Sequence, residues 1–244
     1  MRVWLVQRIG KPAGGAVADG EGFIDSPDAE ILALGFNTGK AYGSVGIGRQ
    51  GNFLQWGYSA PPSQMTDAGR RLFLNCVYYI HKFDGKTPLI RRRTVARLAL
   101  AHWGAIINTI QGDQKEFFLS HFPEELYGKY SRDPAGLVKY YRENLEWVYD
   151  DQVFKVDEDI KGLGIDSNRK VASLQRLIEL LDDVPHATTA KKLLSRYTEC
   201  SFETPAQWRQ WFDQNKTRIY FTDTGGYKFK VIPEGYRPAE AAKR

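Results

Sequence analysis

One stretch of the sequence, residues 43–83, constrains the fold most, because it places a glycine-rich strand pair directly before a helix. Residues 44–49 and 52–58 are predicted to form two strands. Their connection at Gln50-Gly51 favours a hairpin, since glycine tolerates the positive φ that a tight turn requires. This local order predicts a sheet with a helix packed on it.

The helix that follows this hairpin has a clear start and a clear apolar face. Thr66 is the expected N-cap, and Asp67 is well placed against the helix dipole. From there to Phe83, apolar residues recur every three or four positions, which predicts one face packed on the sheet. These residues are Leu72, Phe73, Cys76, Val77, Ile80 and Phe83.

The remaining N-terminal residues supply more strands than helices. Strands are predicted at 3–9 and at 29–36, with a short extended piece at 22–24 and a turn at 37–39. In the strand at 44–49, Gly46 and Gly48 share one side, so we expect an aromatic ring, Trp56 or Tyr58, to lie against them. Residues 1–86 are therefore predicted to form a domain with a small, mostly antiparallel sheet and a packing helix.

The rest of the chain is predicted to be mainly helical and to close with a hairpin. Helices are predicted from their apolar spacing at 95–110, 116–119, 126–130, 134–149, 188–197 and 205–215. A further helix is predicted to begin after a cap at Ser167 or Asn168 and to end at 181. Residues 150–166 read as a polar loop, and 219–221 with 227–231 flank a turn typical of a hairpin. The domain is placed at 87–237, with a fraying tail at 238–244. The whole chain is predicted to be an α+β protein.

Composition excludes several classes of protein. No apolar run approaches the roughly 20 residues that cross a bilayer, so no membrane span is expected. A net charge of +5 with interleaved acidic residues does not indicate nucleic-acid binding. The two cysteines, Cys76 and Cys200, do not suggest a disulfide framework. We expect a cytoplasmic protein if the chain is complete, and a secreted or periplasmic one if a leader has been removed.

Motifs for catalysis fail on their context. Residues 46–51 match G-x-G-x-x-G, but a strand rather than a helix follows, so no dipole would hold a pyrophosphate. Residues 35–41 resemble a P-loop, but the motif is one spacer residue too short and Ala41 stands where a serine or threonine hydroxyl would bind magnesium, so a P-loop is rejected. The residues around Ser44 differ from G-x-S-x-G at the first glycine, and Ser44 is predicted to begin a strand rather than a nucleophile turn. A serine hydrolase stays an alternative, because a catalytic triad is recognised by its geometry and not by sequence order.

The remaining polar clusters also favour ordinary explanations. The four histidines have no metal-ligand spacing, so neither a metal nor a cofactor is expected. The basic run 91–93 and the carboxylates at 124–125, 157–159 and 182–183 are interpreted as solvated groups. No catalytic residue is assigned.

Two resemblances add to these observations. The first is carried by residues 46–52, by Trp56-Gly57 and by the helix end at 75–80. On these motifs, 41–80 resembles the closing part of ThuA-like, class I glutamine amidotransferase-like domains, where a strand pair and a final helix complete an α/β sheet. No G-x-C-x-G elbow is present, so the resemblance implies architecture and not amidotransferase activity.

The second resemblance lies near the C-terminus. Leu193-Leu194 in one helix and Trp208 with Trp211 in the next make 190–212 similar to a terminal unit of HEAT-type helical-repeat proteins. Glu199 stands where such units have glycine, and no second copy occurs at a repeat period. The resemblance implies contact with another protein.

The sequence therefore favours a non-catalytic binding or scaffolding protein that contacts a protein partner or forms a homo-oligomer. The alternative is a carbohydrate-linked enzyme or hydrolase of ThuA-like ancestry, with a carbohydrate ligand near the 49–56 hairpin. Its candidate ligand-binding residues are Arg49, Gln50, Asn52, Gln55 and Trp56.

Overall fold

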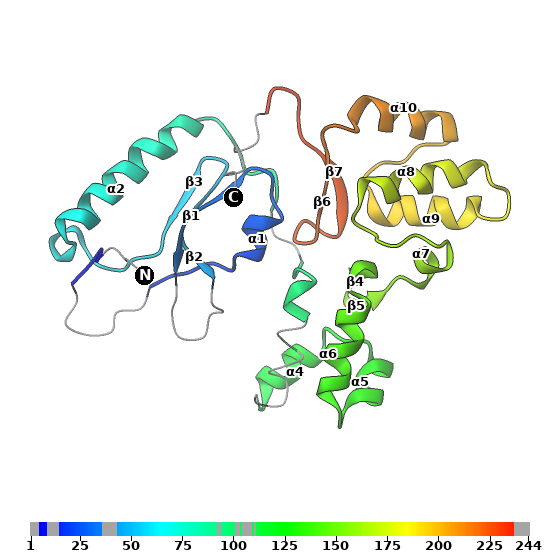
Figure 1. Cartoon of the computed structure of the whole chain (residues 1–244), viewed down its shortest axis with the longest axis horizontal. Coiled ribbons are helices and arrows are strands. Elements are labelled where there is room, and N and C mark those ends of the chain that lie inside the picture. Colours follow the sequence, from blue (N-terminus) through cyan, green and yellow to red (C-terminus); the bar gives the residue numbers. More distant parts are fainter. Residues whose placement is uncertain are drawn as a thin grey trace. The chain divides into compact units, whose positions relative to one another are not determined.

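The chain divides into two compact units. The computed structural model describes residues 5–8, 15–35, 43–91, 94–100, 103, 109 and 111–236, apart from the side chain of Gln114. Unit 1 comprises residues 1–91 and 235–244, and unit 2 comprises residues 92–234 (Figure 1). Both units combine helices with small antiparallel sheets, which confirms the predicted α+β class.

Unit 1 is built on a three-stranded antiparallel sheet in the order β1–β2–β3. Its elements are α1 (Glu21–Ile24), β1 (Ala29–Gly35), β2 (Ser44–Gln50), β3 (Phe53–Trp56), the 3-10 turn η1 (Pro62–Gln64), α2 (Asp67–Ile80) and the 3-10 turn η2 (His81–Phe83). Gln50 pairs with Phe53, and Gly51 makes the turn with φ of 55°. The predicted hairpin is therefore confirmed, with the first strand one residue longer than predicted and the second shorter at both ends.

The glycine side of β2 lies against a different ring from the one expected. A Cβ on Gly48 would clash with the ring of Phe23, and a Cβ on Gly46 would meet the backbone of Gly35 in β1. Close packing of these glycines is confirmed, but the assignment of Trp56 or Tyr58 as the ring is wrong. Phe23 reaches the strand because residues 21–24 form the helical turn α1, where an extended piece was predicted.

Helix α2 begins as the sequence predicts. The Thr66 hydroxyl accepts a hydrogen bond from the Gly69 N–H (3.0 Å), which satisfies one of the free amides of the first turn. Edge-to-face contact between Phe73 and Trp56 (5.2 Å between centroids) packs α2 against β3. Cys76 is buried as expected, but Val77 is half exposed, so its place on the packed face was predicted wrongly.

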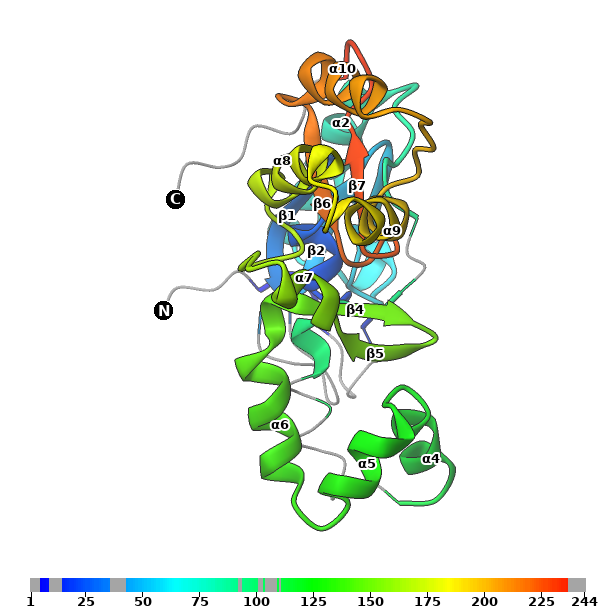
Figure 2. The same cartoon turned by 90° about the vertical axis from the view of Figure 1, so that its right-hand side faces the viewer.

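Unit 2 contains two separate two-stranded antiparallel sheets among short helices. Its elements are α4 (Asp113–Leu119), α5 (Glu124–Tyr130), α6 (Pro134–Glu143), the 3-10 turn η3 (Leu145–Trp147), β4 (Val148–Asp151), β5 (Val153–Val156), α7 (Glu158–Gly162), α8 (Val171–Glu179), the 3-10 turn η4 (Leu180–Asp182), α9 (Ala187–Tyr197), α10 (Pro205–Asn215), β6 (Ile219–Thr222) and β7 (Lys228–Val231). Figure 2 shows α8, α9 and α10 gathered beside β6 and β7. Leu174, Leu193, Trp208 and Phe229 join these elements in one apolar core.

A second apolar core lies around β5 and α6. Its fully buried members include Leu100, Tyr141, Phe154 and Tyr227. Tyr141 donates its hydroxyl to Phe154 O (2.9 Å), so this aromatic core also satisfies its polar atom. Tyr149 and Phe221 pack against both cores.

Several predictions for unit 2 are confirmed. Pro123 separates α4 from α5, and Asp133 caps α6 by accepting from the Gly136 N–H (2.9 Å). Helix α10 has the predicted bounds, and Thr204 with Gln207 completes a capping box at its start. The terminal hairpin is present as β6 and β7.

Other predictions for unit 2 are wrong. Helix α6 ends at Glu143 rather than at 149, and the presumed loop at 150–166 contains the β4–β5 hairpin and α7. Ser167 and Asn168 do not cap α8, whose N-cap is Lys170. Predictions for most of 3–9, for 37–39, 92–93, most of 101–110 and 238–244 lie outside the described residues. No helix in the described part of the chain has the length and apolarity to span a bilayer.

Candidate functional site

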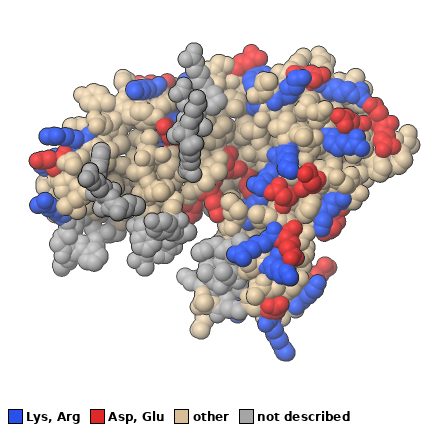
Figure 3. Space-filling model, in the orientation of Figure 1, with Lys and Arg blue, Asp and Glu red and all other residues tan. Residues whose placement is uncertain are grey.

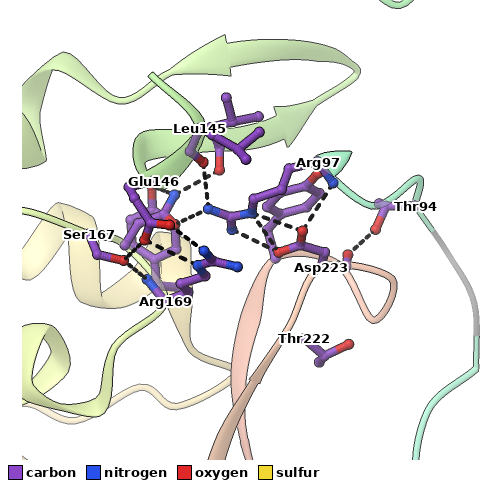
Figure 4. A network of polar contacts seen from close by, with 12 residues as sticks. Thr94, Arg97, Leu145, Glu146, Ser167, Arg169, Thr222 and Asp223 are labelled. Atoms are coloured by element: carbon purple, nitrogen blue, oxygen red, sulfur yellow. Dashed lines mark hydrogen bonds and ion pairs between the residues drawn. The ribbon is translucent and has the colours of Figure 1, made fainter. Parts of the chain in front are cut away.

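A fully buried arginine organises the centre of unit 2. Arg97 binds the Asp223 carboxylate through Nε (2.8 Å) and Nη2 (2.7 Å), and its own backbone N–H adds a third donor to Asp223 (3.0 Å). Its Nη1 donates to Leu145 O and to Asn168 Oδ1 (both 2.9 Å). Figure 4 shows this guanidinium between Asp223 of the β6–β7 turn and Leu145. Every nitrogen of the guanidinium is therefore hydrogen-bonded, as burial of a charge requires.

The network continues from Asn168 to the surface. Asn168 Nδ2 donates to Val148 O (2.8 Å) and to the Tyr197 hydroxyl (3.2 Å), and that hydroxyl donates to Asp157 (2.5 Å). The buried Asp157 carboxylate also accepts from Arg196. Asp157, which was interpreted as a solvated carboxylate, is thus an internal partner, and that prediction is wrong.

An open cavity of about 370 Å³ lies where this network reaches the surface. It is lined by 149–151 of β4, by Arg196 and Tyr197 at the end of α9, and by 226–228 at the start of β7. We call it the unit 2 pocket. Three separate segments meet there, so its lining depends on the folded arrangement of the whole unit.

Most charged and aromatic groups of the unit 2 pocket already have internal partners. Arg196 lies over the Tyr149 ring (4.5 Å), and Arg97 lies near the Tyr227 ring (5.3 Å). The Lys228 ammonium binds the carbonyls of Ser195, Arg196 and Thr198 at the end of α9, where a cation also complements the helix dipole. Burial lowers the pKa of Lys228, whereas these carbonyl contacts favour its charged form.

Asp150 differs from these paired groups. Burial raises the pKa of Asp150 and the nearby His121 lowers it, and within the described parts of the chain the Asp150 carboxylate forms no ion pair. Its carboxylate accepts a hydrogen bond from the Gln152 backbone. The neighbouring Asp151, by contrast, is exposed and pairs with Lys155 (2.8 Å).

The backbone N–H and C=O of Asp150 point away from β5. Asp157 donates its N–H to Trp147 O (2.9 Å), which continues the β4–β5 ladder by one pair. Because bonded and non-bonded pairs alternate in an antiparallel ladder, Tyr149 and Asp151 direct their backbone groups to β5. The N–H and C=O of Asp150 therefore lie on the outer edge of β4.

Backbone strain gathers at the same place. Gln152 (φ 64°) in the β4–β5 turn and Tyr227 (φ 55°) before β7 are the non-glycine residues with positive φ in the part of the chain that the structure describes. A left-handed conformation is unfavourable for a bulky residue such as tyrosine. Such strain is concentrated at binding and catalytic sites, and here it borders the unit 2 pocket.

In unit 1, the structure places Arg49 and Trp56 of the sequence-derived candidates in the interior. Arg49 is buried, donates to Glu30 (3.2 Å) and Gly51 O (2.9 Å), and stacks on the Phe83 ring (3.7 Å). Arg49 Nη2 and Trp56 Nε1 are the two buried side-chain donors without a partner among the described residues. Such donors call for an explanation, of which a bound water is the simplest.

The other candidates in unit 1 bind the chain itself or face solvent. Gln50 donates to Ser26 Oγ (3.1 Å) and Ile90 O (2.9 Å), and Gln55 donates to Ala16 O (2.7 Å). Asn52 is exposed. The Gln50 and Gln55 side chains hold backbone segments of unit 1 together. None of the five candidate residues lines either of the two cavities described in this article.

Sequence analysis missed the residues of the unit 2 pocket and its network. One signal was present, because Arg97 is a single charge within the apolar run 95–100. Asp223 was read only as a turn residue, and Asn168 as a cap. Among the described residues, no group of three or more histidines, cysteines or carboxylates is arranged to hold a metal ion.

Comparison of the chain with protein-family models, with curated proteins and with solved structures found no match. The resemblances of 41–80 and 190–212 therefore stay predictions.

Proposed function

We propose that this protein is a non-catalytic binding protein whose unit 2 pocket holds a small zwitterionic ligand, of which a free α-amino acid is the simplest. One observation carries the proposal. Asp150, whose half-buried carboxylate lies near His121 but forms no ion pair among the described residues, lines the same cavity as Arg196. The two groups offer opposite charges to one ligand.

The ligand's ammonium group would bind Asp150. A carboxylate that is partly removed from water is costly unless a donor or a cation compensates it, and the described part of unit 2 provides the Gln152 backbone N–H and the charge of His121 without an ion pair. The carbonyl on the outer edge of β4 gives a second acceptor for the same ammonium. A hydrogen bond to a charged group contributes about 1.5–3 kcal/mol, which corresponds to roughly a tenfold to hundredfold change in affinity.

The ligand's carboxylate would bind Arg196. Asp157 accepts a hydrogen bond from Nη1 of this guanidinium. The Nε and Nη2 atoms of Arg196 are accessible from solvent, because neither is a buried atom without a partner. A guanidinium presents five donors in a plane suited to carboxylate recognition. An aromatic cage for an alkylated ammonium is less well supported, because arginines already lie at the Tyr149 and Tyr227 rings.

Non-catalytic binding is favoured because the lining lacks the partners of a nucleophile. No serine, cysteine or histidine lines the unit 2 pocket. The Tyr197 hydroxyl donates to Asp157, and burial together with that carboxylate raises the pKa of Tyr197 far above neutrality. It is therefore a poor proton donor or acceptor for catalysis at neutral pH.

The test is a titration of the full chain with glycine, L-lysine and L-glutamate as zwitterions, monitored by the backbone resonance of Gly226. Methylammonium and acetate are the single-charge comparisons, and glucose tests a neutral polyol. We expect zwitterions to shift Gly226 at lower concentration than either single-charge compound. Equal responses to all of these compounds, or a response to glucose alone, would contradict the proposal.

Two variants give a matched comparison. Asp150→Asn should weaken zwitterion binding about tenfold or more, because it removes the charge that meets the ammonium. Asp166→Asn changes an exposed carboxylate outside the pocket that pairs with Lys170 (2.9 Å), so affinity should change less than about threefold. Equal loss in both variants would show that Asp150 has no specific role.

A further inference from the structure

The outer face of α2 in unit 1 is apolar in its middle. Leu74 (55% exposed), Val77 (50%) and Tyr78 (77%) lie there within two turns. Figure 3 shows charged side chains at both ends of this helix and uncharged surface between them. Adjacent exposed apolar side chains of this size indicate a contact surface.

A hollow beside these residues has the form of a helix-packing site. It measures about 400 Å³ and is lined by Ala68, Arg71, Leu72 and Asn75. These positions are i, i+3, i+4 and i+7, the four residues that surround one inserted side chain when two helices pack alongside each other. The hollow therefore fits a side chain from a second helix.

The order of residues along this face is complementary to itself. From start to end it presents Asp67, Arg71, Leu74, Tyr78 and Lys82. An antiparallel copy with its two-fold axis near Leu74 places Asp67 opposite Lys82 and Arg71 opposite Tyr78. The first pair has opposite charges, and the second permits a cation–π contact.

The same axis also fills the hollow. It places Tyr78 of the second copy level with the centre of the residues 68, 71, 72 and 75. A parallel pair would instead set Asp67 against Asp67 and Lys82 against Lys82. Antiparallel pairing therefore satisfies both the shape and the charges of this face.

We infer that α2 pairs antiparallel with α2 of a second copy of this chain. A two-fold axis makes such an interface closed and self-complementary. A helix of 14 residues is about 21 Å long, so the contact is small and the dimer should be weak and concentration-dependent. The inference is independent of the unit 2 pocket.

Sedimentation velocity of the full chain, over a concentration series that reaches the millimolar range, tests the inference. We expect a monomer–dimer equilibrium. Tyr78→Ala should raise the dimer dissociation constant about tenfold or more, because it removes the side chain that enters the hollow. Leu34→Ala, which changes an equally exposed leucine on β1, is the matched control and should leave the equilibrium unchanged.

A charge exchange tests the antiparallel arrangement. Asp67→Lys and Lys82→Asp should each weaken the dimer severalfold, because each places like charges opposite each other at both ends. The double variant should restore it. Circular dichroism of each variant shows whether α2 still forms.

Three results would overturn the inference. A strict monomer throughout the series would show that α2 does not pair with itself. Dimerisation that persists in the Tyr78→Ala variant would place the interface elsewhere. Charge variants that fail to compensate each other would exclude the antiparallel register.

Discussion

Among the described residues, each unit has one buried arginine, and the two differ in how completely they are paired. Arg97 in unit 2 has all its guanidinium nitrogens hydrogen-bonded, with Asp223 as a bidentate partner. Arg49 in unit 1 shares Glu30 with the Tyr79 hydroxyl and leaves Nη2 without a partner. Glu30 is 29% exposed, so solvent also reaches its carboxylate.

The comparison separates two uses of a buried charge. Arg97 ties residues that are far apart in sequence, 97, 145, 168 and 223, into one arrangement, which specifies how unit 2 folds. Arg49 packs chiefly by stacking on Phe83 and by joining neighbouring strands. We therefore expect unit 2 to depend on its arginine more strongly than unit 1 does.

The largest predicted effect is that of Arg97→Met. The change removes Arg97 from the buried Asp223 carboxylate, which should lower the free energy of unfolding by about 3–5 kcal/mol. Denaturant unfolding measures the loss. Hydrogen exchange should localise it to unit 2, because all the hydrogen-bond partners of Arg97 lie there.

Two further variants control this prediction. Adding Asp223→Asn to Arg97→Met removes the buried negative charge that Arg97 had paired and should recover part of the loss. Arg91→Met, at an exposed arginine, should change stability by less than about 0.5 kcal/mol. A double variant no more stable than Arg97→Met would show that the charge itself is not what unit 2 requires.

Local signals explain which parts of the fold were predictable. The hairpin at Gly51, the start of α2 at Thr66 and the bounds of α10 each follow from residues within a few positions of one another. The β4–β5 hairpin has no such signal, because a positive φ at Gln152 forms its turn without glycine. Its strands have four residues each, too few for alternation to be recognised.

The candidate site was not predictable for a different reason. Arg97 and Asp223 lie 126 positions apart, and only tertiary packing brings them together. Polar residues such as Asp157 and Asn168 have the same sequence character whether they cap a helix, face solvent or join a buried network. The lone Arg97 in its apolar run was the single usable signal, and it named no partner.

Arg49→Met should have an intermediate effect. It removes the hydrogen bonds to Glu30 and Gly51 O, but methionine keeps the contact with Phe83, and the unpaired nitrogen disappears. We expect the free energy of unfolding, measured by denaturant unfolding, to fall by about 1–2 kcal/mol. The change in hydrogen exchange should be confined to unit 1. A loss as large as that of Arg97→Met would contradict the difference between the two arginines.

The smallest predicted effect concerns Asp150. Its carboxylate forms no ion pair among the described residues, whereas Arg49 pairs with Glu30. Burial raises the pKa of Asp150, so the folded protein holds this proton at pH values where the unfolded chain has released it. In that window the native state binds more protons, and its stability falls as pH rises from the unfolded pKa through the folded one. Above the folded pKa the cost of the charged group is constant.

Asp150→Asn should remove this cost while it keeps an acceptor for the Gln152 backbone. At neutral pH the variant should be more stable than the parent by roughly half a kcal/mol, whereas Asp151→Asn should not gain stability because it loses the Lys155 pair. The gain should shrink as pH falls below the folded pKa, where the parent's Asp150 is neutral too. A residue that weakens the fold yet is needed for ligand binding is typical of a functional site. If the Asp150→Asn variant is instead less stable than the parent at neutral pH, Asp150 has a structural role.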